Sequence, residues 1–412
     1  MTATPLESNA NLRTPPTFGL EENKPLWEDR QEMIARRGRF RLQARARWLL
    51  RGERRKDKKG KDAPYRIDNC LLALGGLADG YAVITKLKLL TGPEIDVRAV
   101  YRLLQICGSV WHCPVCAARI ANERRQEIHQ AVKLAEQLGY RVVLVTYTAR
   151  HDRSTNLVAQ LTAMAKAHEA VWHGAASKRL RERSGWLGMI RTLECTHSKR
   201  NGWHPHIHAI IFIKATTDVQ WFEQTLRARW ELCAAKYDLS MNEHGFDLLD
   251  SSSWVADYVA KWEHEPKWRE ADELARWHTK KGRPVREQDE HYSPWQLLDF
   301  ADNGDAQAGK LWREYALTYY GRQQLHWSRG LRAALGMGQE ITDEEAAEKD
   351  MEETVKMLDV YLSDEQWQWV KGNDLRTELL EAVEQHDADG IVDFCQQAYD
   401  FAPKVERLTR DA

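Results

Sequence analysis

The sequence predicts an α+β fold in which helices flank an antiparallel β-sheet, and three observations carry that prediction. Short β-branched runs alternate with longer segments of helical periodicity, in the order strand, helix, hairpin, helix, strand, helix. A turn segment at 198–202 joins two of these runs directly, which is typical of an antiparallel hairpin. Seven cysteines, four of them before residue 117, indicate a small metal-binding segment in front of the sheet.

The elements of the expected core follow one another without a long gap. Residues 140–148 form a β-branched run that ends in Thr-Tyr-Thr and predict a strand. Further strands are expected at 186–195, 203–213 and 245–249. Apolar residues at helical spacing predict helices at 121–138, 156–183 and 218–237. Ser251–Ser253 supply an N-cap for one more helix.

The net charge of −1 hides two regions of opposite sign. The segment from Glu340 to the C-terminus has 21 acidic and 7 basic residues, whereas the rest of the chain has 40 acidic and 53 basic residues. This basic region favours contact with a polyanion such as DNA. The sequence shows no signal peptide and no apolar run close to the roughly 20 residues of a membrane helix. We therefore expect a cytoplasmic protein with reduced cysteines and no membrane partner.

Composition divides the chain into four expected regions. Residues 1–63 are expected to be a disordered and basic N-terminal arm, helical in the first part of its basic stretch, whose Arg-Lys end suits phosphate contact or plain solvation. Residues 64–138 hold a Cys-rich zinc-binding segment and a helix. Residues 139–335 form the α+β core with an extension, and residues 336–412 form a helical, acidic C-terminal region.

The cysteine segment has the spacing of a structural Zn²⁺ site. Cys107, Cys113 and Cys116 lie close together in the sequence, and Cys70 lies upstream. Three or four thiolates satisfy a structural zinc ion. Cys70 is the expected fourth ligand and His112 is the alternative, because neighbouring residues such as His112 and Cys113 rarely bind one metal together. A buried cysteine cluster without metal is the competing interpretation.

The run Trp-His-Pro-His-Ile-His at 203–208 predicts a strand with a histidine face. Successive side chains of a strand point to opposite faces, so His204, His206 and His208 share one face. Two imidazoles two residues apart can hold one divalent ion. His204 lies nearer the turn, and we expect it to face DNA or to support the ligands from outside. A polar face of an ordinary sheet is the competing interpretation.

The register of the hairpin decides whether Glu194 joins these histidines. A loop centred near Arg200 places Glu194 opposite His206, and a loop centred one residue later places it opposite His208. A tight two-residue turn would instead direct Glu194 to the other face. We expect the wider loop, and two imidazoles with one carboxylate suit Mn²⁺ or Mg²⁺.

A tyrosine and a lysine follow the hairpin at helical spacing. Tyr258 and Lys261 are three residues apart and share one face of the expected helix. The cysteine segment, the His-x-His strand and the Tyr-x-x-Lys helix, in this order, resemble the HUH endonucleases. Among these, the chain is most similar to the rolling-circle replication initiators (Rep proteins) of plasmids and single-stranded phages. The resemblance covers residues from about 65 to 335.

The resemblance implies a DNA-nicking enzyme. In that family the histidine pair binds a metal that polarises a phosphate, and a tyrosine attacks the phosphate and stays joined to the 5′ end. Carried over, His206, His208 and Glu194 would bind the metal, and Tyr258 would be the nucleophile. Lys261 would favour the phenolate of Tyr258. The free 3′-OH would prime replication, and the strand would later be rejoined.

Other tyrosines compete for the role of nucleophile. Tyr147 and Tyr237 are the competing candidates, and both rank well below Tyr258.

The resemblance also implies partners. Origin DNA, single-stranded or supercoiled and double-stranded, would be the substrate, and Lys199 and Arg200 with His204 are expected to contact it. No phosphate-binding G-x-x-x-x-G-K-[ST] loop is present, so a host helicase and a single-strand binding protein are implied.

The chain departs from the family at two positions. A second tyrosine found in some relatives is replaced by Trp262, and a glutamate found in others is replaced by Trp254. The second cleavage therefore lacks an obvious agent. Asp257, Glu263 or the tyrosine of a second subunit, in a dimer, are candidates.

Three other functions stay open. A transposase or relaxase would use the same chemistry on different DNA. A zinc-dependent DNA-binding regulator would bind DNA without cutting it. A metal hydrolase would cut DNA with activated water and leave no protein on the product.

Overall fold

The computed structural model separates the chain into two units. The larger unit comprises residues 34–72 and 104–351, and the smaller unit comprises residues 1–33, 73–103 and 352–412. The residues that the structure describes are 26–57, 59–72, 82–89, 96–250, 291–349 and 354–408. No helix within these ranges is both long and apolar enough to cross a lipid bilayer. The expected α+β class with antiparallel sheets is confirmed.

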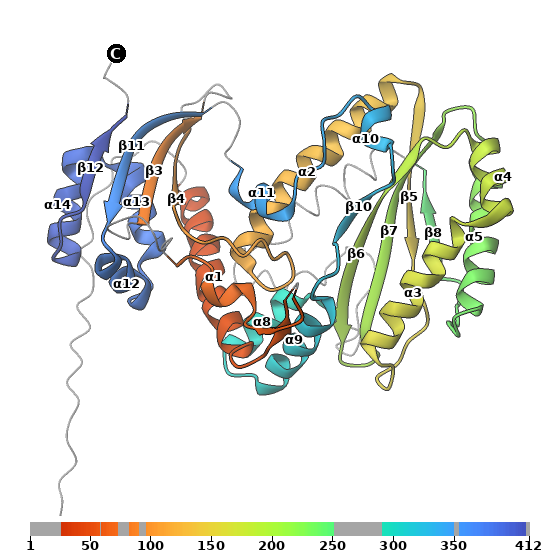
Figure 1. Cartoon of the computed structure of the whole chain (residues 1–412), viewed down its shortest axis with the longest axis horizontal. Helices are drawn as coiled ribbons and strands as arrows, with labels where there is room; N and C mark the ends of the chain where they lie inside the picture. Colours follow the sequence, from red (N-terminus) through yellow and green to blue (C-terminus); the bar gives the residue numbers. More distant parts are fainter. Residues whose placement is uncertain are drawn as a thin grey trace, which may run out of the picture. The chain divides into compact units, whose positions relative to one another are not determined.

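The larger unit is built on an antiparallel sheet with the strand order β10-β6-β7-β5-β8 (Figure 1), and β9 pairs with a further stretch of β6. Its strands are β5 (Tyr140–Tyr147), β6 (Gly188–Ser198), β7 (Gly202–Lys214), β8 (Phe246–Leu249), β9 (His291–Tyr292) and β10 (Leu325–Trp327). Its helices are α1 (Leu26–Leu49, from Ile34 onward), α2 (Pro114–Gln137), α3 (Leu157–Val171), α4 (Gly174–Ser184), α5 (Val219–Ala235), α8 (Pro294–Asp302), α9 (Ala306–Tyr319), α10 (Leu331–Ala334) and α11 (Asp343–Glu348).

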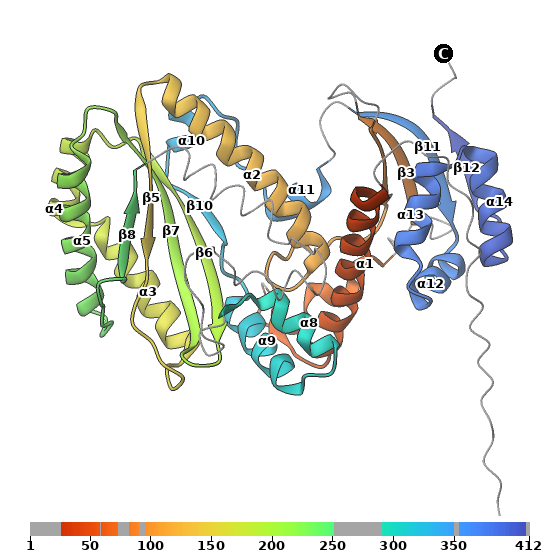
Figure 2. The ribbon, with the colours of Figure 1, turned by 180° about the vertical axis from the view of Figure 1, so that it is seen from behind.

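Helices cover both faces of this sheet. On one face, Phe212 and its apolar neighbours pack with Ile128 of α2, which runs obliquely beside the strands in Figure 2. On the other face, Tyr147 contacts His168 of α3 and Trp230 of α5. Because side chains alternate along each strand, β7 contributes residues to the packing on both faces of the sheet. The even-numbered residues of β7 that lie beyond the apolar cluster are the histidines.

Within the described residues, the expected strands and helices of the core are present, with two differences in their bounds. The helix expected at 121–138 begins earlier, at Pro114, because the Sγ of Cys113 accepts from the backbone N–H of Cys116 and caps it. The helix expected at 156–183 is two helices, α3 and α4. The backbone breaks at Gly174, whose φ of 82° is open mainly to glycine.

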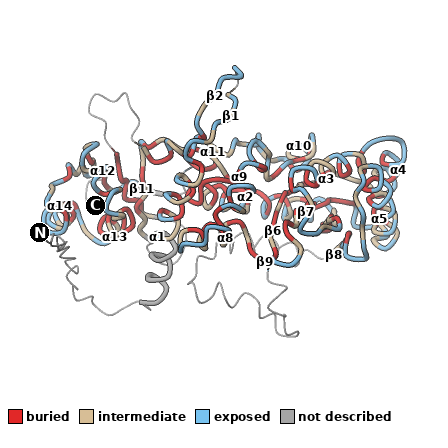
Figure 3. The backbone as a smooth tube through the Cα atoms, turned by 90° about the horizontal axis from the view of Figure 1, so that it is seen from below, coloured by how far each residue is buried: buried red, intermediate tan, exposed pale blue. Residues whose placement is uncertain are grey.

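The basic N-terminal segment is folded further than the sequence predicts. The expected arm at 1–63 contains α1 and a small hairpin of β1 (Arg55–Lys56) and β2 (Asp62–Ala63). Asp57 accepts hydrogen bonds from the backbone N–H groups of Lys59 and Lys61 and closes the turn. Most of this hairpin is exposed in Figure 3. Residues 1–25, expected to be disordered, lie outside the described ranges.

The smaller unit is a four-stranded antiparallel sheet with helices. Its strand order is β12-β11-β3-β4. Its elements are β3 (Ala82–Leu89), β4 (Asp96–Arg102), β11 (Thr354–Leu362), α12 (Asp364–Gly372), α13 (Arg376–Gln385), α14 (Ala388–Tyr399) and β12 (Lys404–Arg407). The acidic C-terminal region was expected to be helical, yet it also supplies two strands. The smaller unit thus joins residues 73–103 to the C-terminal segment, because β11 pairs with β3.

Candidate functional site

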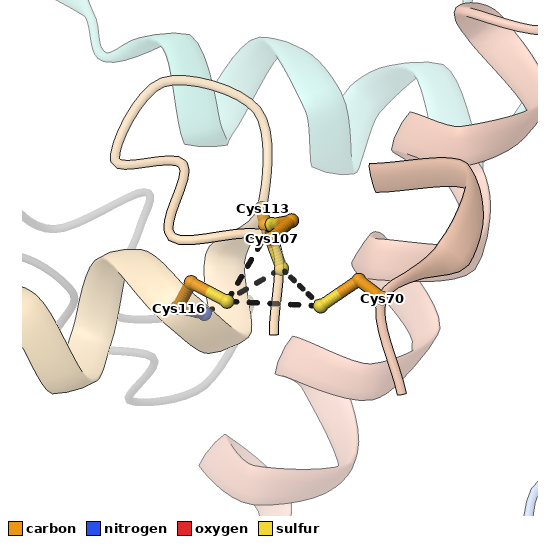
Figure 4. A group of neighbouring side chains, drawn as sticks. All are labelled: Cys70, Cys107, Cys113 and Cys116. Atoms are coloured by element: carbon orange, nitrogen blue, oxygen red, sulfur yellow. Dashed lines mark hydrogen bonds between the residues drawn. The ribbon is translucent and has the colours of Figure 1, made fainter. Parts of the chain in front are cut away.

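Four cysteines form a buried cluster in the larger unit (Figure 4). Cys113 and Cys116 lie at the start of α2, Cys107 lies in the preceding loop, and Cys70 follows the short 3₁₀ helix Arg66–Asn69. Their sulfur atoms all lie within 4.8 Å of one another. The separations are 3.8 Å between Cys70 and Cys113, 3.7 Å between Cys70 and Cys116, and 3.5 Å between Cys107 and Cys116.

The cluster has the dimensions of a tetrahedral metal site. Zinc binds thiolates at about 2.3 Å, which requires sulfur atoms about 3.8 Å apart. The measured separations fit that requirement. The neighbouring thiols, together with burial, raise the pKa of Cys107 well above its ordinary value. The Cys107 thiol therefore resists ionisation by itself, and the cluster could hold a cation such as Zn²⁺ that stabilises thiolates.

The structure settles the choice of the fourth sulfur. Cys70 belongs to the cluster, as expected. His112 does not, because its Nε2 is 2.8 Å from the carbonyl oxygen of Ala316. Helix α1 supports the cluster from outside: the Nε2 of Gln43 donates to the Sγ of Cys113 at 3.3 Å, and Arg47 donates to the carbonyl of Cys70 at 2.6 Å. Sequence reasoning missed both of these supporting residues.

The hairpin of β6 and β7 has the wider loop that the sequence predicts. Ser198 lies opposite Gly202, so three residues centred on Arg200 form the loop. Glu194 is consequently opposite His206, and this register confirms the expectation. Gly202 has a φ of 76°, and a Cβ atom there would lie 3.2 Å from the Cα of Arg153. Glycine is therefore required both by the turn and by the close approach of the neighbouring loop.

Glu194, His206 and His208 share one face of this hairpin. The Nε2 of His208 is 3.1 Å from the Oε2 of Glu194. The rings of His206 and His208 are nearly parallel, with centroids 5.8 Å apart. The hydroxyl of Thr146 on β5 lies 3.0 Å from the Nδ1 of His208. Since a hydroxyl can donate or accept, Thr146 fixes the ring with Nε2 toward Glu194 in either tautomer.

Two imidazoles of this face, those of His204 and His206, are neutral at physiological pH. Burial, followed by the neighbouring His208, lowers the pKa of His206 to about 3. Burial and the neighbouring His206 lower the pKa of His204 to about 2. Neutral rings keep a nitrogen lone pair, which metal binding requires. His204 and His206 would take up protons only at low pH, so at neutral pH their nitrogen atoms remain available to bind a metal cation.

More histidines gather here than the sequence predicts. The ring of His204 lies 3.9 Å from that of His206 and 4.2 Å from that of His151, measured between centroids. His291 of β9 lies 6.2 Å from His204. His204 therefore sits between His206 and the loop after β5. No sequence pattern connects His151 or His291 with the hairpin, because only the fold brings them together.

The two candidate clusters differ in how far their donor atoms converge. Among the described residues, the four cysteines are the group of three or more metal-binding side chains whose donor atoms meet within 4.8 Å. Glu194 and the histidines line one face without converging to that degree. Lys199 and Arg200, expected to contact DNA, lie exposed in the hairpin loop.

The expected nucleophile lies outside the described residues. Tyr258 and Lys261, with the helix proposed to carry them, fall in the range 251–290. The structure does argue against Tyr147, one competing nucleophile. Its side chain points to the face opposite the histidines and is fully buried, and burial raises the pKa of its hydroxyl well above the ordinary value. Tyr237, the other competitor, is half-buried just after α5.

Comparisons with known proteins agree with this arrangement. Residues 102–230, which include the end of the cysteine segment and the hairpin, match the family model described as "Replication protein". The chain is 30% identical over 300 residues to "Protein rep" of Streptomyces lividans, covering 57% of this chain and 64% of that protein. It is 35% identical over 138 residues to "Neomycin resistance protein" of Streptomyces cyanogenus, covering 28% of this chain and 32% of that protein.

These matches are partial. The chain spans just under two thirds of the first relative and about a third of the second. No solved structure gives a significant match. The shared region contains Cys107, Cys113 and Cys116 together with the Glu194 and histidine face. Through residues 102–230 the chain is therefore similar to Rep replication proteins.

Proposed function

We propose that the protein initiates replication by nicking one strand of its origin DNA through Tyr258. The tyrosine would become joined to the 5′ end at the nick and would leave a 3′-OH that primes synthesis. In a later step the strand would be rejoined. The observation that carries the proposal is the register of the hairpin, which aligns Glu194 with His206 and His208 on one face.

The donor set supports a metal at this face. His206, His208 and Glu194 would hold Mn²⁺ or Mg²⁺, which would supply Lewis-acid polarisation of the scissile phosphate when bound. Thr146 would keep the Nε2 of His208 pointing inward. His204 would border the site, and Lys199 and Arg200 in the adjacent loop would attract the DNA backbone.

The covalent step is a transesterification. The phenolic oxygen of Tyr258 would form a bond to phosphorus, and the bond from phosphorus to the 3′ oxygen would break. The departing 3′ oxygen would take up a proton, and the phenol would lose one, a loss that Lys261 would favour. One phosphodiester replaces another, so the step needs no external energy source. Host helicase and single-strand binding protein would then act on the opened DNA.

A labelling experiment on a denaturing gel tests this proposal. The protein is mixed with Mn²⁺ and single-stranded DNA of its origin, labelled on the 3′ side of the nick. A slow-migrating protein–DNA adduct is expected, and it should vanish with chelator and in Tyr258→Phe. Tyr237→Phe is the matched control, because it removes a phenol elsewhere on the chain, and it should keep the adduct.

The other outcomes point to the competing functions. An adduct that persists in Tyr258→Phe and is lost in Tyr237→Phe would show that Tyr237 is the nucleophile. Cleavage without an adduct would indicate a metal hydrolase. Binding of confirmed origin DNA with neither cleavage nor adduct would refute the endonuclease and favour a zinc-dependent DNA-binding regulator. A transposase or relaxase would form the same adduct and would differ in the DNA that it selects.

A further inference from the structure

A cavity of about 520 Å³ lies behind the tip of the β6–β7 hairpin. His197 and Trp203 line it, and these two residues lie opposite each other in the hairpin. Tyr292 of β9 also lines it and lies opposite His197. Because opposite residues share a face, the cavity opens on the face away from Glu194 and His206. The hairpin tip thus separates two features, the histidine face and this cavity.

The walls of the cavity suit a flat aromatic ligand. Trp203, Tyr292 and Phe300 supply aromatic surface, and Leu297 and Leu311 supply aliphatic surface. Tyr292 and Phe300 are already arranged edge to face, with centroids 5.2 Å apart. Aromatic walls of this kind stack on nucleobases whatever their sequence.

The polar groups of the cavity are divided between its rim and its wall. Arg153 and Lys199 are exposed and bring positive charge to the rim, and the ammonium of Lys199 lies 5.8 Å from the centre of the Tyr292 ring. The acidic residues of the wall already have partners within the protein. Asp305 accepts from the backbone N–H groups that begin α9, and Glu314 accepts from the Nε1 of Trp203 at 3.0 Å.

We infer that this cavity binds one unpaired nucleobase of the DNA strand, with the phosphate of that nucleotide at Arg153 and Lys199. The strand would pass around the hairpin tip, with the scissile phosphate on the histidine face and a neighbouring base held behind it. The volume of about 520 Å³ accommodates a base with room for its sugar. Gly202 permits this arrangement, because it lets the loop that carries Arg153 approach the tip. The inference rests on the proposed function for the identity of the strand.

Photocrosslinking tests where the base lies. A twelve-residue oligothymidylate with 5-iododeoxyuridine at one internal position is bound to the full chain and irradiated, and the crosslinked peptide is identified by mass spectrometry. Crosslinks to Trp203, Tyr292 or Phe300 are expected. Crosslinks confined to aromatic residues outside the cavity would overturn the inference.

Affinity measurements test whether the base is recognised. Wild-type protein should bind oligothymidylate about tenfold more tightly than the same strand with abasic sites. The two strands carry the same backbone charge and differ only in whether bases are present. Gln307→Trp fills the cavity from an exposed position on α9 and should abolish that difference. Gln224→Trp, at an exposed position on α5 away from the cavity, is the matched control and should preserve it. An unchanged base preference in a folded Gln307→Trp protein would refute the inference.

A charge variant separates the phosphate contact from the base contact. Arg153→Ala should weaken binding of intact and abasic strands by the same factor, whereas Arg179→Ala on the exposed side of α4 should leave both unchanged. These measurements need neither Mn²⁺ nor the nicking reaction. Loss of the Tyr258 adduct together with a normal base preference would therefore reject the proposed function alone. A normal adduct without base preference would reject the cavity alone.

Discussion

The cysteine cluster and the histidine face are two candidate metal sites built on opposite plans. The cysteines converge on one point, with sulfur atoms 3.5 to 3.8 Å apart, and they are buried. Glu194 and the histidines lie along a strand face with partly open side chains, and the centroids of His206 and His208 are 5.8 Å apart. A structural metal site is closed by protein ligands, whereas a catalytic site leaves positions for substrate. The two regions should therefore respond differently to the loss of one ligand.

The largest expected effect is on folding. Cys116→Ala should abolish zinc binding and destabilise the larger unit by several kcal/mol, because a structural zinc site contributes on the order of 10 kcal/mol to folding. Zinc content by atomic absorption, together with urea unfolding, measures this. Cys233→Ala, which removes a buried thiol of α5 far from the cluster in sequence, should retain one zinc ion per chain. Wild-type protein that folds equally well without zinc would contradict a structural role for the metal.

Loss of a ligand at the histidine face should affect activity and spare folding. His206→Ala should lower the rate of adduct formation at least about 100-fold, since even the outer partners of metal ligands are worth 10–100-fold. Its free energy of unfolding should stay within about 1 kcal/mol of wild type. His244→Ala, at an exposed position, is the control. If His206→Ala destabilised the protein as much as Cys116→Ala, the histidine face would have a structural role as well.

A smaller effect is expected from Thr146. Thr146→Val keeps the shape of the side chain and removes the hydroxyl that orients His208. The Mn²⁺ concentration for half-maximal adduct formation should rise about 10-fold, while the rate at saturating Mn²⁺ should change little. Thr162→Val, a hydroxyl on α3, provides the comparison. A change in the saturated rate with no change in the Mn²⁺ requirement would assign Thr146 another role.

The smallest expected effect concerns a histidine outside both sites. His168 is fully buried beneath the sheet, and burial, with lesser contributions from Arg191 and His326, lowers its pKa to about 3. The unfolded chain therefore takes up a proton below pH 6.5 that the folded chain refuses, so stability falls as pH drops below 6.5 toward 3. At pH 5.5 the loss from this group is about 1 kcal/mol. Urea unfolding of His168→Gln should show a correspondingly flatter pH dependence between pH 7 and 5, and His173→Gln should not.

Short-range features of the fold could be predicted, and the contacts between distant segments could not. The turn segment of the hairpin sets its own register, so the alignment of Glu194 with His206 follows from the local sequence. Cys70 could be placed because zinc ligation restricts which residues qualify. Thr146 lay within a recognised run, but its contact with His208 depends on the pairing of β5 with β7. His151 joins the site through a loop whose path no periodicity encodes.

The cavity behind the hairpin tip could not be predicted from the sequence. Its lining comes from the hairpin, from the loop after β5, from β9 and from two helices that follow the undescribed range 251–290. Each of its aromatic residues taken alone is most simply interpreted as core. Only the pairing of His197 with both Trp203 and Tyr292 shows that they share a face.

The pairing of β3 with β11 has a consequence for the order in which the chain can fold during synthesis. The sheet of the larger unit is complete once residue 327 has been made, whereas β3 must wait for β11 near the end of the chain. Until then, the hairpin of β3 and β4 presents an unpaired edge, which is a template for pairing with another chain. A chain that ends before residue 354 would thus have its β6–β7 hairpin formed while the edge of β3 that pairs with β11 stays exposed and able to pair with another chain.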